Sequence, residues 1–134
     1  MIDQTKLPNT LEFVTYTDFN QIADAIRTLV VRGAPAIGVS GAFGLALAAL
    51  QSDATEKDEL ISFLENSKKI LFETRPTAVN LAWGLEKIMQ VAKNANSVDQ
   101  IRTDVVEYAK KMAEEDIQIN MTMGKNGSIL FDDN

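Results

Sequence analysis

Cysteine and histidine are both absent from the 134-residue chain. Without cysteine there is no disulfide, no thiolate nucleophile and no cysteine-ligated metal. Without histidine the chain also lacks the commonest general base and the commonest transition-metal ligand. We therefore predict that this chain holds no catalytic residue, no metal and no cofactor of its own.

Positive charge is also scarce. The chain has 13 Lys and Arg against 19 Asp and Glu, for a net charge of -6. This balance argues against a nucleic-acid partner, because phosphate backbones favour basic surfaces. Hydrophobic residues make up 46% of the chain, which indicates one globular domain with a sizeable core. No basic segment followed by an apolar one opens the chain, so we expect no secretory leader and a cytoplasmic location.

A segment without charged residues runs from Gly33 to Ser52, about the length of a minimal membrane-spanning helix. It contains four glycines, a proline and six alanines, which is a modestly apolar composition for a bilayer. Gly38, Gly41 and Gly44 recur at every third position, where they would let two backbones approach closely. We predict a buried helix of a helical bundle and no membrane partner.

The hydrophobic pattern predicts a mainly α domain of five helices behind a small antiparallel β-hairpin. The hairpin is expected over residues 1–16, with strands at 1–3 and 11–16. Helices are expected over 17–123, with breaks near Gly33, near Ser52, at Arg75-Pro76 and near Asn96. Residues 124–134 are expected to form a turn, then a strand or linker that leads toward a missing second domain. Trp83 and Tyr108 are expected in the core.

Two arginine turns carry the functional signal. Arg32 and Gly33 lie at the predicted N-terminus of the helix that begins near Pro35. Arg75 and Pro76 lie just before the predicted fourth helix. Free backbone N–H groups and the positive end of the dipole make a helix N-terminus suitable for an anion, and arginine adds a fixed charge. Because Pro35 has no N–H, we expect the donors at the first entrance to be Ala36 and Ile37. The pattern predicts a phosphate-bearing ligand; alternatively, Arg32 only complements the end of the preceding helix and Arg75 is a solvated turn residue.

Three motifs resemble one enzyme family in the same order. They are DQTKLP at 3–8, VRGAPAIGVSGAFGLALA at 31–48 and TRPTAVNLAWGL at 74–85. Together they resemble the N-terminal half of methylthioribose-1-phosphate isomerases, within a superfamily that includes regulatory subunits of translation initiation factor 2B. The resemblance implies a helical N-terminal domain followed by a Rossmann-like C-terminal domain that is absent here.

The resemblance also implies an activity and its binding residues. The family converts 5-methylthioribose 1-phosphate into 5-methylthioribulose 1-phosphate in methionine salvage, a branch of amino-acid biosynthesis. Its catalytic cysteine and aspartate belong to the C-terminal domain, so this chain alone is expected to be inactive. Arg32, Gly33, Ala34 and Arg75 match the family's substrate-binding turns.

The partners expected on this reading are the phosphorylated sugar and the missing C-terminal domain. Exposure of the surface that faces that domain also leads us to expect self-association into a homo-oligomer, or a swapped terminal strand. The alternative interpretation is a non-catalytic binding or regulatory module, as in the initiation-factor relatives.

Overall fold

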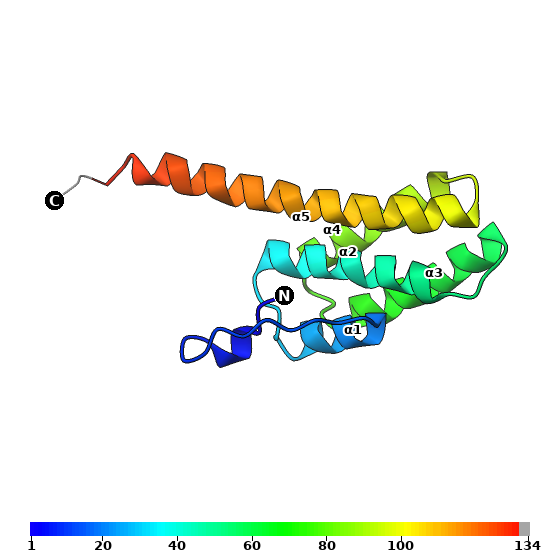
Figure 1. The fold of residues 1–134 in the computed structure, drawn as a ribbon, viewed down its shortest axis with the longest axis horizontal. Coiled ribbons are helices and arrows are strands. Elements are labelled where there is room, and N and C mark those ends of the chain that lie inside the picture. Colours follow the sequence, from blue (N-terminus) through cyan, green and yellow to red (C-terminus); the bar gives the residue numbers. More distant parts are fainter. Residues whose placement is uncertain (132–134) are drawn as a thin grey trace.

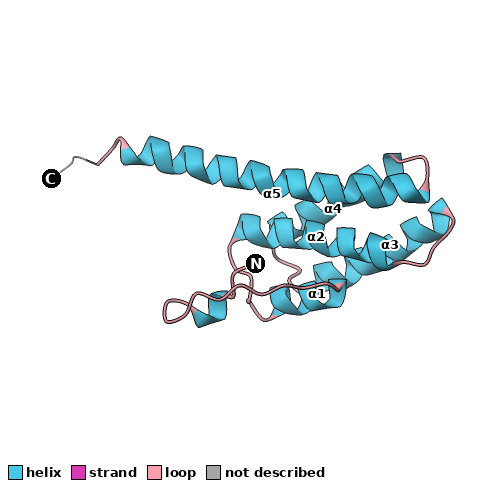
Figure 2. Cartoon of the chain, viewed as in Figure 1, coloured by secondary structure: helices cyan, strands magenta, loops and turns pink. Residues whose placement is uncertain are grey.

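The computed structural model describes residues 1–131, which contain five α-helices and no strand (Figures 1 and 2). A short 3-10 helix, η1, comes first. The bounds of the elements are η1 Gln4–Lys6, α1 Phe19–Arg27, α2 Ala34–Gln51, α3 Lys57–Glu73, α4 Val79–Asn94 and α5 Val98–Ser128. The prediction of a mainly helical domain with five helices is confirmed.

Helix α2 is the centre of the bundle, because all four other α-helices pack against it. Its length and apolar composition alone would allow it to cross a membrane, yet more than half of its residues are buried inside the domain. Leu45, Ala42 and Ala48 on α2 are fully buried together with leucines and isoleucines of the surrounding helices. A helix that is apolar all round is stable in water only when neighbours cover most of its surface. The surrounding helices do so for α2, apart from a partly exposed stripe of Val39, Phe43 and Leu47 and the exposed Leu50.

The predicted N-terminal hairpin is wrong. Ile2 and Phe13 form a single isolated antiparallel bridge, flanked by hydrogen bonds from the Asp3 and Val14 N–H groups. The reason lies in Asp3, whose Oδ1 accepts hydrogen bonds from the N–H and the hydroxyl of Thr5, at 3.0 and 2.6 Å. These bonds cap η1 and bend the chain out of the extended conformation directly after the bridge.

Helix α1 ends earlier than predicted. Its C-cap is Thr28, and Leu29 follows with a φ of +61°, a left-handed conformation that stops a helix. Arg32 therefore lies in the connection to α2 and not in the last turn of α1. The explanation of Arg32 as a cation at the end of the preceding helix loses its structural basis.

The predicted turn at 124–127 and strand at 128–131 are also wrong, since α5 continues to Ser128. The part of this prediction at 132–134 lies outside the described residues. Gly124 and Gly127 sit within the helix, and Gly33 is the one glycine in residues 1–131 with a positive φ. Glycine weakens a helix by about 1 kcal/mol without ending it when no left-handed conformation is required. Met112 is the last buried residue of α5, and the C-terminal part of the helix projects past the bundle (Figure 1).

Trp83 is not a core residue. Its side chain is 50% exposed, whereas Tyr108 packs against the core in a partly buried position. Trp83 lies one residue before Gly84 on α4, beside a groove between α2, α4 and α5. Leu81 and Leu85 are fully buried on the other face of α4, so the expectation that Trp83 belongs to the core is wrong.

Candidate functional site

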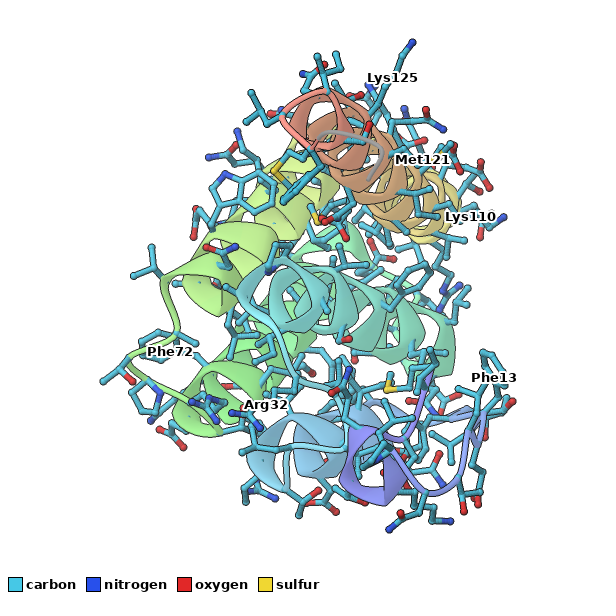
Figure 3. The ribbon with its side chains drawn as sticks, turned by 90° about the vertical axis from the view of Figure 1, so that its left-hand side faces the viewer. Phe13, Arg32, Phe72, Lys110, Met121 and Lys125 are labelled. Atoms are coloured by element: carbon cyan, nitrogen blue, oxygen red, sulfur yellow. The ribbon has the colours of Figure 1, made fainter. Side chains whose placement is uncertain are left out.

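The two arginine turns meet at one end of the bundle. Arg32 and Arg75 line the same cleft, which has a volume of about 490 Å³. Gly33 and Ala34, the other predicted binding residues, also line it. Figure 3 looks onto this end, with Arg32 between α1 and the turn that joins α3 to α4. The structure thus brings together the four residues that the sequence singled out.

Gly33 shapes the first wall of the cleft. It is the N-cap of α2, with φ 106° and ψ 133°, a conformation that glycine adopts without the steric cost of a Cβ. The Ile37 N–H donates to the Gly33 carbonyl at 2.9 Å, so the expectation that Ile37 offers a free donor is wrong. Pro35 has no N–H, which leaves the N–H groups of Ala34 and Ala36 as the unbonded donors in the first turn. Ala34 lines this cleft, whereas Ala36 lines a neighbouring groove beside the N-terminal segment, so only the Ala34 N–H lies at the cleft.

Arg75 is held by a tight turn at the second wall. The Ala78 N–H donates to the Arg75 carbonyl at 3.0 Å, closing a four-residue β-turn. Pro76 occupies the second position of that turn, where its fixed φ is favoured. The turn leads directly into α4, whose N-cap Ala78 has no side chain able to cap the helix.

Two helix N-termini without side-chain caps therefore open at this cleft. By contrast, Asp18 caps α1 and Ser97 caps α5 with side-chain hydrogen bonds. Helix α3 also lacks a side-chain cap, so this feature is shared with one helix away from the cleft. At α2 and α4 the uncapped ends coincide with arginines, which adds positive charge to the free N–H groups.

The four arginines of the chain divide into two kinds. Arg27 pairs with Asp24, and the Arg102 guanidinium donates to three backbone carbonyls near the end of α2. Arg32 and Arg75 form no ion pair or side-chain hydrogen bond within residues 1–131. The Arg75 Nε is buried and has no hydrogen-bond partner. Burying a charged donor without a partner is costly, and this donor belongs to a side chain that lines the cleft.

Except for Ile37, which was expected as a backbone donor, the remaining lining residues were not predicted from the sequence. They are Leu29, Ile37, Thr77, Ala78, Val79 and Asn80. The lining contains no acidic residue within the described part of the chain, although the chain as a whole is acidic. Thr77 and Asn80 add a hydroxyl and an amide, which suit a hydroxylated ligand. Asn80 could have been suspected from its place in the first turn of the helix that follows Arg75.

The fold and the cleft define a helical domain in which two arginines and two helix N-termini meet at one cleft. The chain belongs to the family described as the initiation factor 2 subunit family, whose profile matches residues 30–134. It is 44% identical over 133 residues to a methylthioribose-1-phosphate isomerase of Trichlorobacter lovleyi, covering 98% of this chain and 38% of that protein. It is 41% identical to methylthioribose-1-phosphate isomerase 1 of Pseudothermotoga lettingae, covering 99% of this chain and 38% of that protein.

Solved structures agree with these relatives. One is described as translation initiation factor eIF-2B, subunit delta, from A. fulgidus; it has a TM-score of 0.92 and 42% identity, and the match covers 100% of this chain and 39% of that chain. Another is 5-methylthioribose 1-phosphate isomerase from Pyrococcus horikoshii, with a TM-score of 0.91 and 39% identity over 98% of this chain and 37% of that chain. The family predicted from the three motifs is confirmed. The chain spans about two-fifths of the length of these relatives.

Proposed function

We propose that this chain is the substrate-binding N-terminal part of an aldose–ketose sugar-phosphate isomerase that acts on 5-methylthioribose 1-phosphate. The observation that carries the proposal is the convergence of the unpaired Arg32 and Arg75 on one cleft between two uncapped helix N-termini. The names of the relatives that match nearly the whole chain support the choice of substrate.

The chemistry of the cleft fits a phosphate dianion. A guanidinium donates two parallel hydrogen bonds to phosphate oxygens and remains charged at any working pH. The Ala34 N–H would complete the contacts on the α2 side, and Gly33 lets the ligand approach the backbone. On this proposal the chain binds the substrate. The cysteine and aspartate that perform the isomerisation come from the C-terminal part of the family fold.

Calorimetric titration of this chain tests the binding half of the proposal. We expect 5-methylthioribose 1-phosphate to bind with a Kd on the order of 1 mM, because the cleft is open, and unphosphorylated methylthioribose to bind at least tenfold more weakly. Arg32→Gln and Arg75→Gln should each raise the Kd severalfold. Arg27→Gln is the matched control, since Arg27 is an exposed arginine paired with Asp24 outside the cleft. Equal affinity for the two sugars would contradict the proposal.

A chimera tests the catalytic context. The matching N-terminal segment of the Trichlorobacter lovleyi relative is replaced by this chain, and isomerase activity is measured. We expect activity in the chimera and a loss of at least a hundredfold in kcat/KM when it carries Arg75→Gln, since a dianion would be left poorly paired. A folded chimera without activity would favour a different role.

The second candidate is a non-catalytic regulatory module. The close match to a structure described as an eIF-2B subunit is the observation that favours it. A regulatory module should bind the sugar phosphate in the calorimetric titration and give an inactive chimera. The two experiments above therefore distinguish it from the isomerase.

A further inference from the structure

Two glycines hold the N-terminal halves of α2 and α4 in direct backbone contact. A Cβ built on Gly84 of α4 would lie 2.4 Å from the Gly38 carbonyl oxygen of α2. A Cβ built on Gly38 would lie 2.7 Å from the Asn80 carbonyl oxygen of α4. Both obstacles are backbone atoms, which cannot rotate away as a side chain can.

The other glycines of α2 make a different kind of contact. A Cβ on Gly41 would meet the end of the Leu81 side chain, and one on Gly44 would meet Leu71 and Ile22 side chains at 3.0–3.2 Å. These neighbours can change rotamer or shift by a few tenths of an ångström. The Gly38–Gly84 pair is therefore the place where the distance between the two helix backbones is fixed.

This contact lies about one turn inside the cleft. Asn80, whose carbonyl faces Gly38, lines the cleft itself, and Gly38 follows the cleft residue Ile37. The separation of the α2 and α4 backbones at the glycine pair thus sets the separation of their N-termini. Arg32 precedes one of these helices and Arg75 precedes the other, so the same contact fixes how the two arginine turns face each other.

We propose that Gly38 and Gly84 are positioning residues for anion binding: their backbone contact sets the spacing of the two arginine-bearing helix entrances. This inference rests on the proposed function of the cleft. Ordinary contacts of a Cβ begin near 3.4 Å, so an alanine requires α2 and α4 to separate by about 0.7 Å at position 38 and by about 1 Å at position 84. Displacements of this size are large for a charged site, where groups must be held to within about 0.5 Å.

The experiment compares Gly38→Ala and Gly84→Ala with Gly44→Ala and Gly124→Ala. Gly44→Ala is the matched control for disturbed packing in α2, and Gly124→Ala controls for alanine in an open helix position. Each variant is crystallised, its thermal unfolding is followed by circular dichroism, and its Kd for inorganic phosphate is measured at constant ionic strength well below the unfolding midpoint.

We expect Gly38→Ala and Gly84→Ala to separate α2 from α4 by about 0.7 Å and about 1 Å, respectively, and to raise the phosphate Kd at least tenfold. Gly44→Ala should lower the unfolding midpoint and leave the Kd within twofold of the unsubstituted chain. The double variant should raise the Kd by less than the product of the two single effects, because the first alanine already separates the helices.

Separated helices with an unchanged phosphate Kd would overturn the inference, and so would an equal loss of affinity in Gly44→Ala. Failure of both contact variants to fold, even at low temperature, would assign the pair a purely structural role and also overturn it. If the unsubstituted chain does not bind phosphate, the proposed function fails, and the crystal structures decide the inference alone. Separation confined to the contact variants would then support the spacing role, and unchanged helices would refute it.

Discussion

Arg102 on α5 forms hydrogen bonds with the C-terminal end of α2, which lies opposite the cleft. Its guanidinium donates to the carbonyls of Ala49, Ser52 and Ala54 at 3.2, 2.7 and 3.1 Å. The Arg102 side chain is 28% exposed, so these charge-assisted bonds are only partly screened. The last carbonyls of a helix have no intrahelical partner, and a cation there also complements the helix dipole.

We predict that Arg102→Leu lowers the free energy of unfolding by about 2–3 kcal/mol. Hydrogen bonds to a charged group contribute about 1.5–3 kcal/mol each, but a simple sum of three overestimates the loss because water can reach some of the freed carbonyls. For a chain of 134 residues, this loss corresponds to a fall of about 9 °C in the unfolding midpoint.

The assay is urea unfolding at pH 7 followed by circular dichroism, with thermal melts in parallel. Arg27→Leu serves as the control, since its ion pair with Asp24 is exposed and should contribute less than about 0.5 kcal/mol. A loss below about 0.5 kcal/mol in Arg102→Leu, equal to that of the control, would refute the assignment of a stabilising role to Arg102.

Three further predictions concern acid stability, α5 and self-association. A hydrogen bond from Lys68 on α3, together with its positive charge, holds the pKa of Glu86 on α4 below its ordinary value, so this pair stabilises the fold above about pH 4.5 and stops doing so as the pH falls through the lowered pKa. Glu86→Gln should therefore show a smaller loss of stability than the unsubstituted chain when urea unfolding is repeated from about pH 5 to about pH 3; an identical slope would contradict this. Gly124→Ala should make the negative ellipticity at the helical minimum larger in magnitude, since the added Cβ meets open space within α5. A smaller magnitude would favour a turn there. Ile119→Lys should reduce self-association in light scattering, because Ile119 is 57% exposed on the projecting part of α5; unchanged association would place the contact elsewhere.

The sequence predicted the helices best where burial and period agree. In α1 and α4 the apolar residues recur at helical spacing along one side, and in α2 they form an uncharged run. Helices are present in all three places, as expected. The motifs also predicted the family and the four cleft residues, and the structure places Arg32 and Arg75 on one cleft.

The errors arise where a local interaction outweighs the pattern. Asp3 caps a helical turn that the alternation of residues 11–16 could not reveal, so the hairpin is reduced to one bridge. Leu29 adopts a left-handed conformation, which is uncommon for leucine and could not be predicted from the sequence, and this conformation shortens α1. Gly124 and Gly127 remain helical because glycine permits a turn without requiring one.

The glycine spacing of α2 illustrates what only coordinates can add. The sequence indicated a close approach of backbones at Gly38, Gly41 and Gly44. The structure shows that only Gly38 among them faces backbone, and that its counterpart is Gly84 on α4. The three positions look alike in the sequence, and the partner lies 46 residues away from Gly38, so neither the distinction nor the pairing could be predicted from local pattern.

The structure of this chain with bound 5-methylthioribose 1-phosphate tests the central claim most directly. The account predicts electron density for the phosphate between the guanidinium groups of Arg32 and Arg75, within hydrogen-bond distance of the Ala34 N–H group. Phosphate density at another surface, or a cleft that stays free of the ligand at saturating concentration, would contradict the assignment of this cleft as the binding site.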